Sequence, residues 1–226
     1  MPIGKFIAIE GLDGSGKTTI IERLKEGFPG IVYTREPGGS PFGEMIRAVL
    51  LDPMSKNVQA LPMLLGFMAA RADHYLSLIL LALNNGETVI SDRFDGSTYA
   101  FQLYAQQKPG LEKRFWELRE DILGVKEGLF CRPNYVYLRI TPDVAAERRK
   151  IRLGEATHFD LQVEEFHQRV FDGYEEFFKC IEKRARIGNT LKGSLYHVEN
   201  GVSVVDADVD FDSVYDSVKK IILSLA

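Results

Sequence analysis

Residues 11–18 have the composition of a loop that binds phosphate. They read GLDGSGKT, with glycines at the first, fourth and sixth positions followed by Lys17 and Thr18. Glycines spaced in this way let the backbone curl so that several N–H groups point at phosphate oxygens. The lysine is expected to reach the β- and γ-phosphates of a nucleotide and the threonine hydroxyl to hold Mg²⁺. The predicted triphosphate site comprises Gly11, Leu12, Asp13, Gly14, Ser15, Gly16, Lys17, Thr18 and Thr19.

The surroundings of this loop favour a phosphate site over a glycine-rich turn that fits the pattern by coincidence. The apolar run 5–10 predicts a buried strand before the loop, and residues 17–27 have helical spacing after it. The helix adds its partially positive N-terminal end. A GTPase would carry N-K-x-D, which this sequence lacks. The pattern therefore indicates a small-molecule kinase that uses ATP.

A second polar group, Asp92-Arg93, follows the apolar run 87–91. The carboxylate could hold Mg²⁺ through water, and the guanidinium could bridge two phosphoryl groups. Asp-Arg is also a common surface pair, but its place at the end of a strand favours the site. We therefore predict that Thr18 and Asp92 hold the metal and that Arg93 takes part in catalysis.

Arginines at 148, 149 and 152 form a third group, on a helix expected to begin at Pro142. Such a run is often only a solvated basic face. Phosphoryl transfer, however, requires cations around the moving group, and a mobile segment can deliver one while excluding water. We predict a lid over residues 146–160, with Arg149 as the first choice for the catalytic cation and Arg152 as the second.

Phe67 and Arg71 form a fourth group, because residues i and i+4 project from the same face of a helix. Core packing is the simpler explanation for Phe67 alone. A guanidinium beside it suits a planar base instead, since the arginine can donate to a pyrimidine O4 where cytosine presents an amine. The pair therefore predicts a base pocket.

These groups require an α/β framework. Strands are predicted at 5–10, 30–34, 87–91, 134–140 and 203–206. Helices are predicted at 17–27, 41–51, 57–83, 97–107, 111–125, from 142, at 161–186 and at 211–225. Alternation of this kind implies a five-stranded parallel sheet covered on both faces, with ligands beyond the carboxyl ends of the strands. We expect one domain over residues 1–226.

Composition limits the cellular setting. The net charge of −4 argues against a nucleic-acid-binding surface. Cys131 and Cys180 fit neither a zinc site nor a disulfide framework, which is typical of the reducing cytoplasm. The N-terminal apolar run is too short for a secretion signal, and the longest apolar stretch, 76–83, is too short to span a bilayer. We expect a cytoplasmic protein without a membrane partner.

The chain resembles the thymidylate kinase family over nearly its whole length, and four stretches carry the resemblance. They are EGLDGSGKTT (10–19), TREPGG (34–39), FMAAR (67–71) and DRFDGSTYAFQ (92–102). The resemblance implies a P-loop nucleoside monophosphate kinase fold, a homodimer, and transfer of the γ-phosphoryl group of ATP to dTMP with Mg²⁺. It also implies that Arg47 and Arg93 bind the acceptor 5′-phosphate, and that Asp13 approaches the sugar 3′-hydroxyl.

The same resemblance assigns the remaining acceptor contacts. Glu36 would lie near the acceptor and the metal, with a catalytic role. Phe67 would stack on the base, Arg71 would hydrogen-bond it, and Phe101 would lie near the sugar. The rest of the implied dTMP site is Pro37, Ser97 and Gln102.

Departures from the family pattern leave alternatives open. Some members carry an arginine in the P-loop where this chain has Gly14, so the cation should come from the lid, as in the bacterial type. Leu103-Tyr104 stands where glycine is common and is the only feature that favours another pyrimidine deoxynucleotide as substrate, such as a 5-modified dUMP. His158 stands where an arginine is usual beyond the lid and could partly substitute for it. Residues 187–201 are expected to form an additional loop or hairpin without an assigned function.

A non-catalytic P-loop regulator is the alternative from another class. A binding module needs no second phosphate site, so the retained acceptor-side residues and lid arginines argue against it. Those acceptor-side residues are Asp13, Glu36, Arg47, Asp92 and Arg93.

Overall fold

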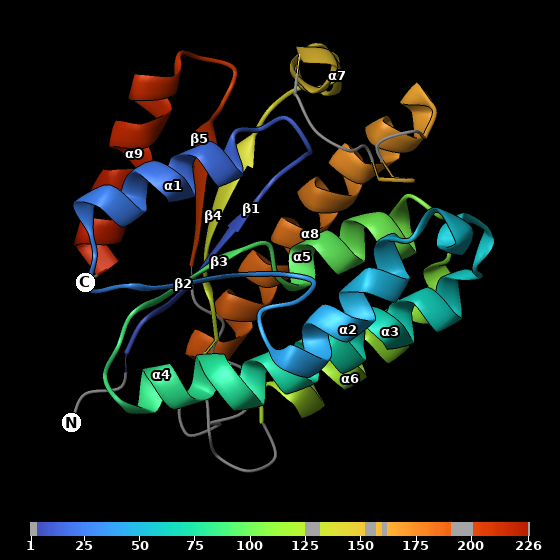
Figure 1. The fold of residues 1–226 in the computed structure, drawn as a ribbon, viewed down its shortest axis with the longest axis horizontal. Coiled ribbons are helices and arrows are strands. Elements are labelled where there is room, and N and C mark those ends of the chain that lie inside the picture. Colours follow the sequence, from blue (N-terminus) through green and yellow to red (C-terminus); the bar gives the residue numbers. More distant parts are fainter. Residues whose placement is uncertain (1–3, 125–131, 152–156, 160–161, 191–200, 226) are drawn as a thin grey trace.

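A computed structural model describes residues 4–124, 132–151, 157–159, 162–190 and 201–225. Five parallel strands form one sheet in the order β2-β3-β1-β4-β5 (Figure 1). They are β1 (Phe6–Glu10), β2 (Val32–Arg35), β3 (Val89–Asp92), β4 (Asn134–Arg139) and β5 (Val202–Asp206). This confirms the predicted five-stranded parallel sheet.

The central strand β1 is buried along its whole length because helices cover both faces of the sheet. In Figure 1, α1 (Lys17–Gly27) and α9 (Phe211–Leu225) lie on one side of the strands. The helices α3 (Ala60–His74), α6 (Glu112–Ile122) and α8 (Glu164–Thr190) lie on the other. The remaining helical segments are α2 (Pro41–Leu51), η1 (Pro53–Asn57), η2 (Tyr75–Ile79), α4 (Leu80–Asn84), α5 (Asp95–Thr98), η3 (Tyr99–Tyr104), η4 (Pro109–Leu111) and α7 (Pro142–Ile151).

The order of strands brings the polar groups to one edge. β1 pairs with β3 so that Ile9 lies opposite Asp92, and the chains leaving both strands therefore emerge together. The P-loop follows β1, and the Asp92-Arg93 turn follows β3. β2 pairs with the other side of β3 and delivers Glu36 to the same edge.

Two predicted helices contain π-helical turns that the sequence pattern did not reveal. The helix predicted at 57–83 runs over Ala60–Asn84, with the π segment η2 in its C-terminal half. The helix predicted at 97–107 begins earlier, as α5, and continues as the π segment η3. In η3 the Ala105 N–H donates to Ala100 O, five residues back. Such widened turns are common at functional sites.

Two further expectations need correction. Residues 187–190, predicted as part of a loop, belong to α8, and residues 191–200 lie outside the described part. Among the described residues, the helix Ala60–Asn84 is long and apolar enough to cross a membrane by length and composition alone. In this structure the helix packs against the rest of the protein, and 44% of its most apolar 18-residue stretch is buried.

Candidate active site

A cleft of about 1010 Å³ opens at the carboxyl end of the sheet. It is lined by the P-loop, the turn after β2, the helix α3, the turn after β3 and the segment from α5 to η3. The sequence-predicted residues that line it are Asp13, Gly14, Ser15, Gly16, Lys17, Thr18, Thr19, Glu36, Pro37, Arg47, Phe67, Arg71, Asp92, Arg93, Ser97, Phe101 and Gln102. The lining does not include Gly11, Leu12 or Arg149, and the Leu12 side chain is buried in the core.

The P-loop has the backbone that its glycines permit. Gly14 and Gly16 have φ values of 96° and 88°, a region that other residues rarely adopt. Lys17 is only 5% exposed, and its Nζ donates to the carbonyl oxygens of Gly11 and Leu12 at 3.0 and 2.8 Å. Burial, assisted by the charge of Arg93, lowers the pKa of Lys17 to about 8. The nearby carboxylates of Asp13, Asp92 and Glu10 favour the charged ammonium but do not fully offset its burial.

Thr18 and Asp92 lie together as predicted for a metal site. The Thr18 hydroxyl donates to Asp92 Oδ2 at 3.0 Å. The other carboxylate oxygen, Asp92 Oδ1, is buried and has no hydrogen-bond partner among the described residues. A buried, unsatisfied carboxylate oxygen is costly, and a hard cation with oxygen ligands would satisfy it. The pair therefore fits Mg²⁺.

Arg93 has the strained backbone of a residue fixed by its surroundings. Its φ is 68°, in the left-handed region that few side chains adopt. Its Nη2 lies 2.6 Å from Asp13 Oδ1, and its Nη1 donates to Gly11 O at 3.0 Å. Burial opposes the charge, but the neighbouring Tyr174 and Asp13 raise its pKa above the ordinary arginine value. A fixed, permanently charged guanidinium thus links the P-loop to the turn after β3.

Two residues that we did not predict complete this arrangement. Glu10, at the end of β1, is fully buried and accepts the N–H groups of Phe94 and Ser97 at 2.8 and 3.1 Å. Tyr174, from α8, accepts from Arg93 Nη1 at 2.8 Å and donates to Glu10 Oε2 at 3.2 Å. Burial raises the pKa of Glu10, although Arg93 opposes that shift. Glu10 stood out as the only acidic residue of an apolar strand, whereas no local pattern pointed to Tyr174.

Arg71 is 2% exposed and already holds several groups. Its Nε donates to Glu36 Oε2 at 2.7 Å, and its Nη2 donates to Phe94 O and Thr98 Oγ1. Among the described residues, its Nη1 meets only the weak acceptor Met68 Sδ, at 3.5 Å. Arg71 lines the cleft, so Nη1 keeps donor capacity for a ligand, while Nε orients Glu36.

Glu36 has a second partner that the sequence analysis missed. His74 Nδ1 lies 3.1 Å from Glu36 Oε1, and His74 Nε2 lies 2.7 Å from Thr34 Oγ1. His74 is fully buried, one turn after Arg71 on α3. Arg71 and His74 hold the two carboxylate oxygens of Glu36 from one helix, which fixes that carboxylate at the edge of the cleft.

Three aromatic rings surround the predicted base pocket. Phe67 lies 6.5 Å from Phe159, and Phe101 lies 5.7 Å from Phe159, measured between ring centroids. Phe159 was not predicted as a site residue, and it comes from the end of the predicted lid. Leu103 and Tyr104 do not line the cleft, because Leu103 is buried in the core and Tyr104 is exposed. The bulk at these two positions therefore does not shape the pocket.

The turn after β2 is tied to α2. Arg47 is half-buried, and its Nη1 donates to Pro37 O at 2.7 Å. His158, expected to replace a missing arginine, hydrogen-bonds through Nε2 to Leu50 O at the end of α2, at 3.0 Å. Thus α2 connects the predicted phosphate contact Arg47 with the segment that carries Phe159.

The lid arginines differ in position. Arg149 Nη1 donates to Asp13 O in the P-loop at 3.1 Å, whereas Arg148 donates to Ala207 O at 2.8 Å. Arg152 lies outside the described residues. A Cβ on Gly14 would come within 2.7 Å of Ala145 O on α7, so no side chain can extend from that position. A cation for the transferring group therefore has to come from another segment.

Comparisons with known proteins agree with this geometry. The thymidylate kinase family profile matches residues 9–198. The thymidylate kinase of Nitrosospira multiformis is 34% identical over 98% of this chain and 98% of its own length. That of Caldanaerobacter subterraneus is 40% identical over 80% and 85% of the two chains. The crystal structure of thymidylate kinase from Ehrlichia chaffeensis covers 98% of this chain and 99% of its own, with 27% identity and a TM-score of 0.66.

Proposed function

The chain belongs to the thymidylate kinase family, and we propose that its cleft transfers the γ-phosphoryl group of ATP to dTMP, giving dTDP and ADP. The observation that carries this proposal is the Arg93–Asp13 contact of 2.6 Å. It joins the predicted triphosphate loop to the predicted acceptor site. Donor and acceptor phosphates bound on its two sides would meet in one cleft, as in-line transfer requires.

The P-loop is the proposed donor site. Its N–H groups and Lys17 would hold the β- and γ-phosphates, and Thr18 with Asp92 would hold Mg²⁺. The metal would supply neutralisation of the charge that grows on the phosphate oxygens. Lys17 would leave the loop carbonyls that it now contacts and turn toward phosphate, a stronger partner.

We propose that the acceptor site contacts both the 5′-phosphate and the base of dTMP. Arg47 and Arg93 would hold the 5′-phosphate, and Asp13 would approach the 3′-hydroxyl. Phe67 would stack on the base while Arg71 Nη1, whose contact in the structure is only the weak acceptor Met68 Sδ, would donate to O4. Glu36 would lie beside the acceptor in the orientation set by Arg71 and His74. The same pocket includes Pro37, Ser97, Phe101 and Gln102.

Catalysis is proposed to be electrostatic. Phosphoryl transfer leaves little covalent chemistry to the protein, so fixed cations around the moving group provide most of the rate enhancement. Lys17 is buried, Arg93 is half-buried, and both line the cleft in which the two phosphates are proposed to bind. Arg149, already in contact with the P-loop, or Arg152 would complete the set when the lid lies over the nucleotides.

An apolar outer face supports a homodimer as the working form. Large apolar side chains on α2 and α3 are exposed, and monomers rarely expose wide patches of this kind. On these two helices they are Phe42, Met45, Val49, Leu61 and Leu65.

The proposed reaction is tested by coupled detection of ADP with a panel of monophosphates. We expect phosphorylation of dTMP and, more weakly, of dUMP, because one methyl group in an apolar pocket contributes only about 1–3 kcal/mol. dCMP, AMP and GMP should be poor. Faster turnover of a 5-modified dUMP would favour the other pyrimidine substrate. Absence of turnover with every nucleotide, in a protein that still binds ATP, would favour the regulator.

A further inference from the structure

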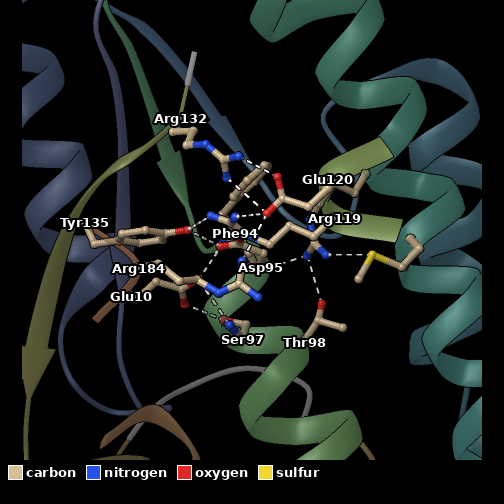
Figure 2. Close-up of polar contacts among 12 residues, drawn as sticks. Glu10, Phe94, Asp95, Ser97, Thr98, Arg119, Glu120, Arg132, Tyr135 and Arg184 are labelled. Carbon is tan, nitrogen blue, oxygen red and sulfur yellow. Dashed lines mark hydrogen bonds and ion pairs between the residues drawn. The ribbon is translucent and has the colours of Figure 1, made fainter. Parts of the chain in front are cut away.

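A buried ionic cluster, Asp95–Arg119–Tyr135, lies outside the residues that line the cleft (Figure 2). Asp95 follows Arg93 by two residues in the chain. Arg119 Nε donates to Asp95 Oδ2 at 2.5 Å, and the Tyr135 hydroxyl donates to Asp95 Oδ1 at 2.6 Å. Arg119 Nη2 also donates to the Tyr135 hydroxyl, at 3.1 Å. All three side chains are no more than 1% exposed. Both oxygens of the Asp95 carboxylate are thus fixed from two directions.

The cluster connects three elements that are far apart in the sequence. Asp95 is the first residue of α5, Arg119 belongs to α6, and Tyr135 belongs to β4. Arg119 is held further by the ring of Trp116, 5.5 Å from its guanidinium carbon, and by Glu120 Oε1 at 3.3 Å. The anchor is therefore built on the sheet and on a packed helix, which move little.

Only Arg93 and Phe94 separate β3 from Asp95. The sheet fixes the chain before this turn, and the cluster fixes it afterwards. Between them, Arg93 is held at a φ of 68°, a conformation that persists only where the surroundings impose it. Glu10 and Arg71 bind the N–H and C=O of Phe94, but both also line or adjoin the cleft. The cluster therefore restrains the turn from outside the cleft, where no bound ligand would contact it.

Stability alone does not account for these charges. A buried ion pair is expensive to desolvate, and apolar residues of similar size are often as stable or more stable in its place. An ion pair that is hydrogen-bonded to a tyrosine fixes the relative orientation of the three side chains, because hydrogen bonds define geometry where apolar contacts do not. This points to a role in placing the turn.

We propose that Asp95, Arg119 and Tyr135 are positioning residues that hold the Arg93 guanidinium in register with the P-loop during phosphoryl transfer. The inference rests on the proposed function, because it assumes that Arg93 acts on the phosphates. It assigns these three side chains no contact with either nucleotide. A small displacement of a catalytic group slows transfer without abolishing binding.

The test compares Tyr135→Phe with Tyr137→Phe in the full-length protein. Asp95→Ala or Arg119→Ala would leave a buried charge unpaired and could prevent folding, whereas Tyr135→Phe removes one hydroxyl. Tyr137 lies two residues later on β4, is also buried, and donates to Glu175 at 3.2 Å instead. We expect Tyr135→Phe to lower kcat for dTMP about fivefold with the KM for ATP within twofold, and Tyr137→Phe to keep kcat within twofold.

A second arm repeats Tyr135→Phe in an Arg93→Lys background. If Tyr135 acts through Arg93, the two effects are not additive, and the added loss of kcat should fall below twofold. An unchanged kcat for Tyr135→Phe, an equal loss for Tyr137→Phe, or full additivity with Arg93→Lys would overturn the inference. Failure of the wild-type protein to phosphorylate dTMP would instead overturn the proposed function.

Discussion

Lys17 is the residue whose charge responds most directly to occupation of the cleft. Burial and the nearby Arg93 lower its pKa to about 8. The unfolded chain keeps this proton up to the ordinary value of 10.5. Between about pH 8 and 10.5 the unfolded state therefore binds more protons at this position, and the contribution of Lys17 to the free energy of unfolding should rise with pH through this window.

Binding of ATP should reverse this shift, because triphosphate favours the charged lysine. At pH 8 the protein should then take up about half a proton on binding ATP, and almost none at pH 6.5. Calorimetry in two buffers with different ionisation enthalpies measures this uptake. Lys17→Met should remove it and lower kcat at least about a hundredfold, or about 3 kcal/mol. Proton uptake at pH 8 that persists in Lys17→Met would assign the titration to another group.

Arg71 combines two tasks, and this changes how its role must be tested. Arg71→Ala would leave the buried Glu36 without its arginine partner, at a cost of about 3–5 kcal/mol in stability. Arg71→Lys retains a cation near Glu36 but removes the planar fork that reaches the base. We expect the preference for dTMP over dCMP, as a ratio of kcat/KM, to fall at least about tenfold, or 1.4 kcal/mol.

Arg47→Ala is the matched control, since a contact to the 5′-phosphate is common to all monophosphates. It should weaken dTMP and dCMP alike. An undiminished preference for dTMP in Arg71→Lys would show that other groups read the base.

At the scale of elements, α7 can carry the catalytic cation because it lies against the P-loop at Gly14. Arg149→Met and Arg152→Met keep the apolar stems and remove the charge. At least one should lower kcat about a hundredfold or more while the KM for dTMP changes little, because the cation acts on the transition state. Lys150→Met, an exposed neighbour on the same helix, is the control. If both arginine variants kept the wild-type kcat, neither arginine would act in catalysis, and the segment would be only a solvated helix end.

The elements that sequence reasoning found are those with a strong local pattern. Apolar runs predicted all five strands, and Pro41, Pro142 and Phe211 begin helices where expected. The π segments η2 and η3 were missed because one extra residue per turn barely alters the apolar spacing.

The site was predictable where residues lie in one motif and unpredictable where distant segments meet. P-loop residues 13–19, Asp92-Arg93 and Phe67 with Arg71 belong to such motifs, and they line one cleft. Tyr174 reaches Arg93 from α8, a contact between segments 81 residues apart, and Phe159 lines the same cleft from the end of the predicted lid. Only the fold brings such residues together, so no spacing in the sequence could reveal them.

At the scale of the whole molecule, the outer surface of α2 and α3 is unusual for a protein that works alone. These two helices lie side by side (Figure 1). Phe42, Met45 and Val49 recur at helical spacing on α2 and are 49%, 69% and 66% exposed. Leu61 and Leu65 extend the apolar surface on α3. The same outward leucines help to make Ala60–Asn84 apolar enough to resemble a membrane span.

A two-fold dimer through this face would bury both copies of the patch, because each subunit presents the same surface to the other. We expect the wild-type protein to be a dimer at micromolar concentration by light scattering after size exclusion. Met45→Glu should yield monomers, since two carboxylates would be buried near the axis without partners. Leu223→Glu, an apolar position 56% exposed on α9, should remain dimeric. A monomeric wild-type protein, or a Met45→Glu variant that stays dimeric, would mean that this face does not join two subunits.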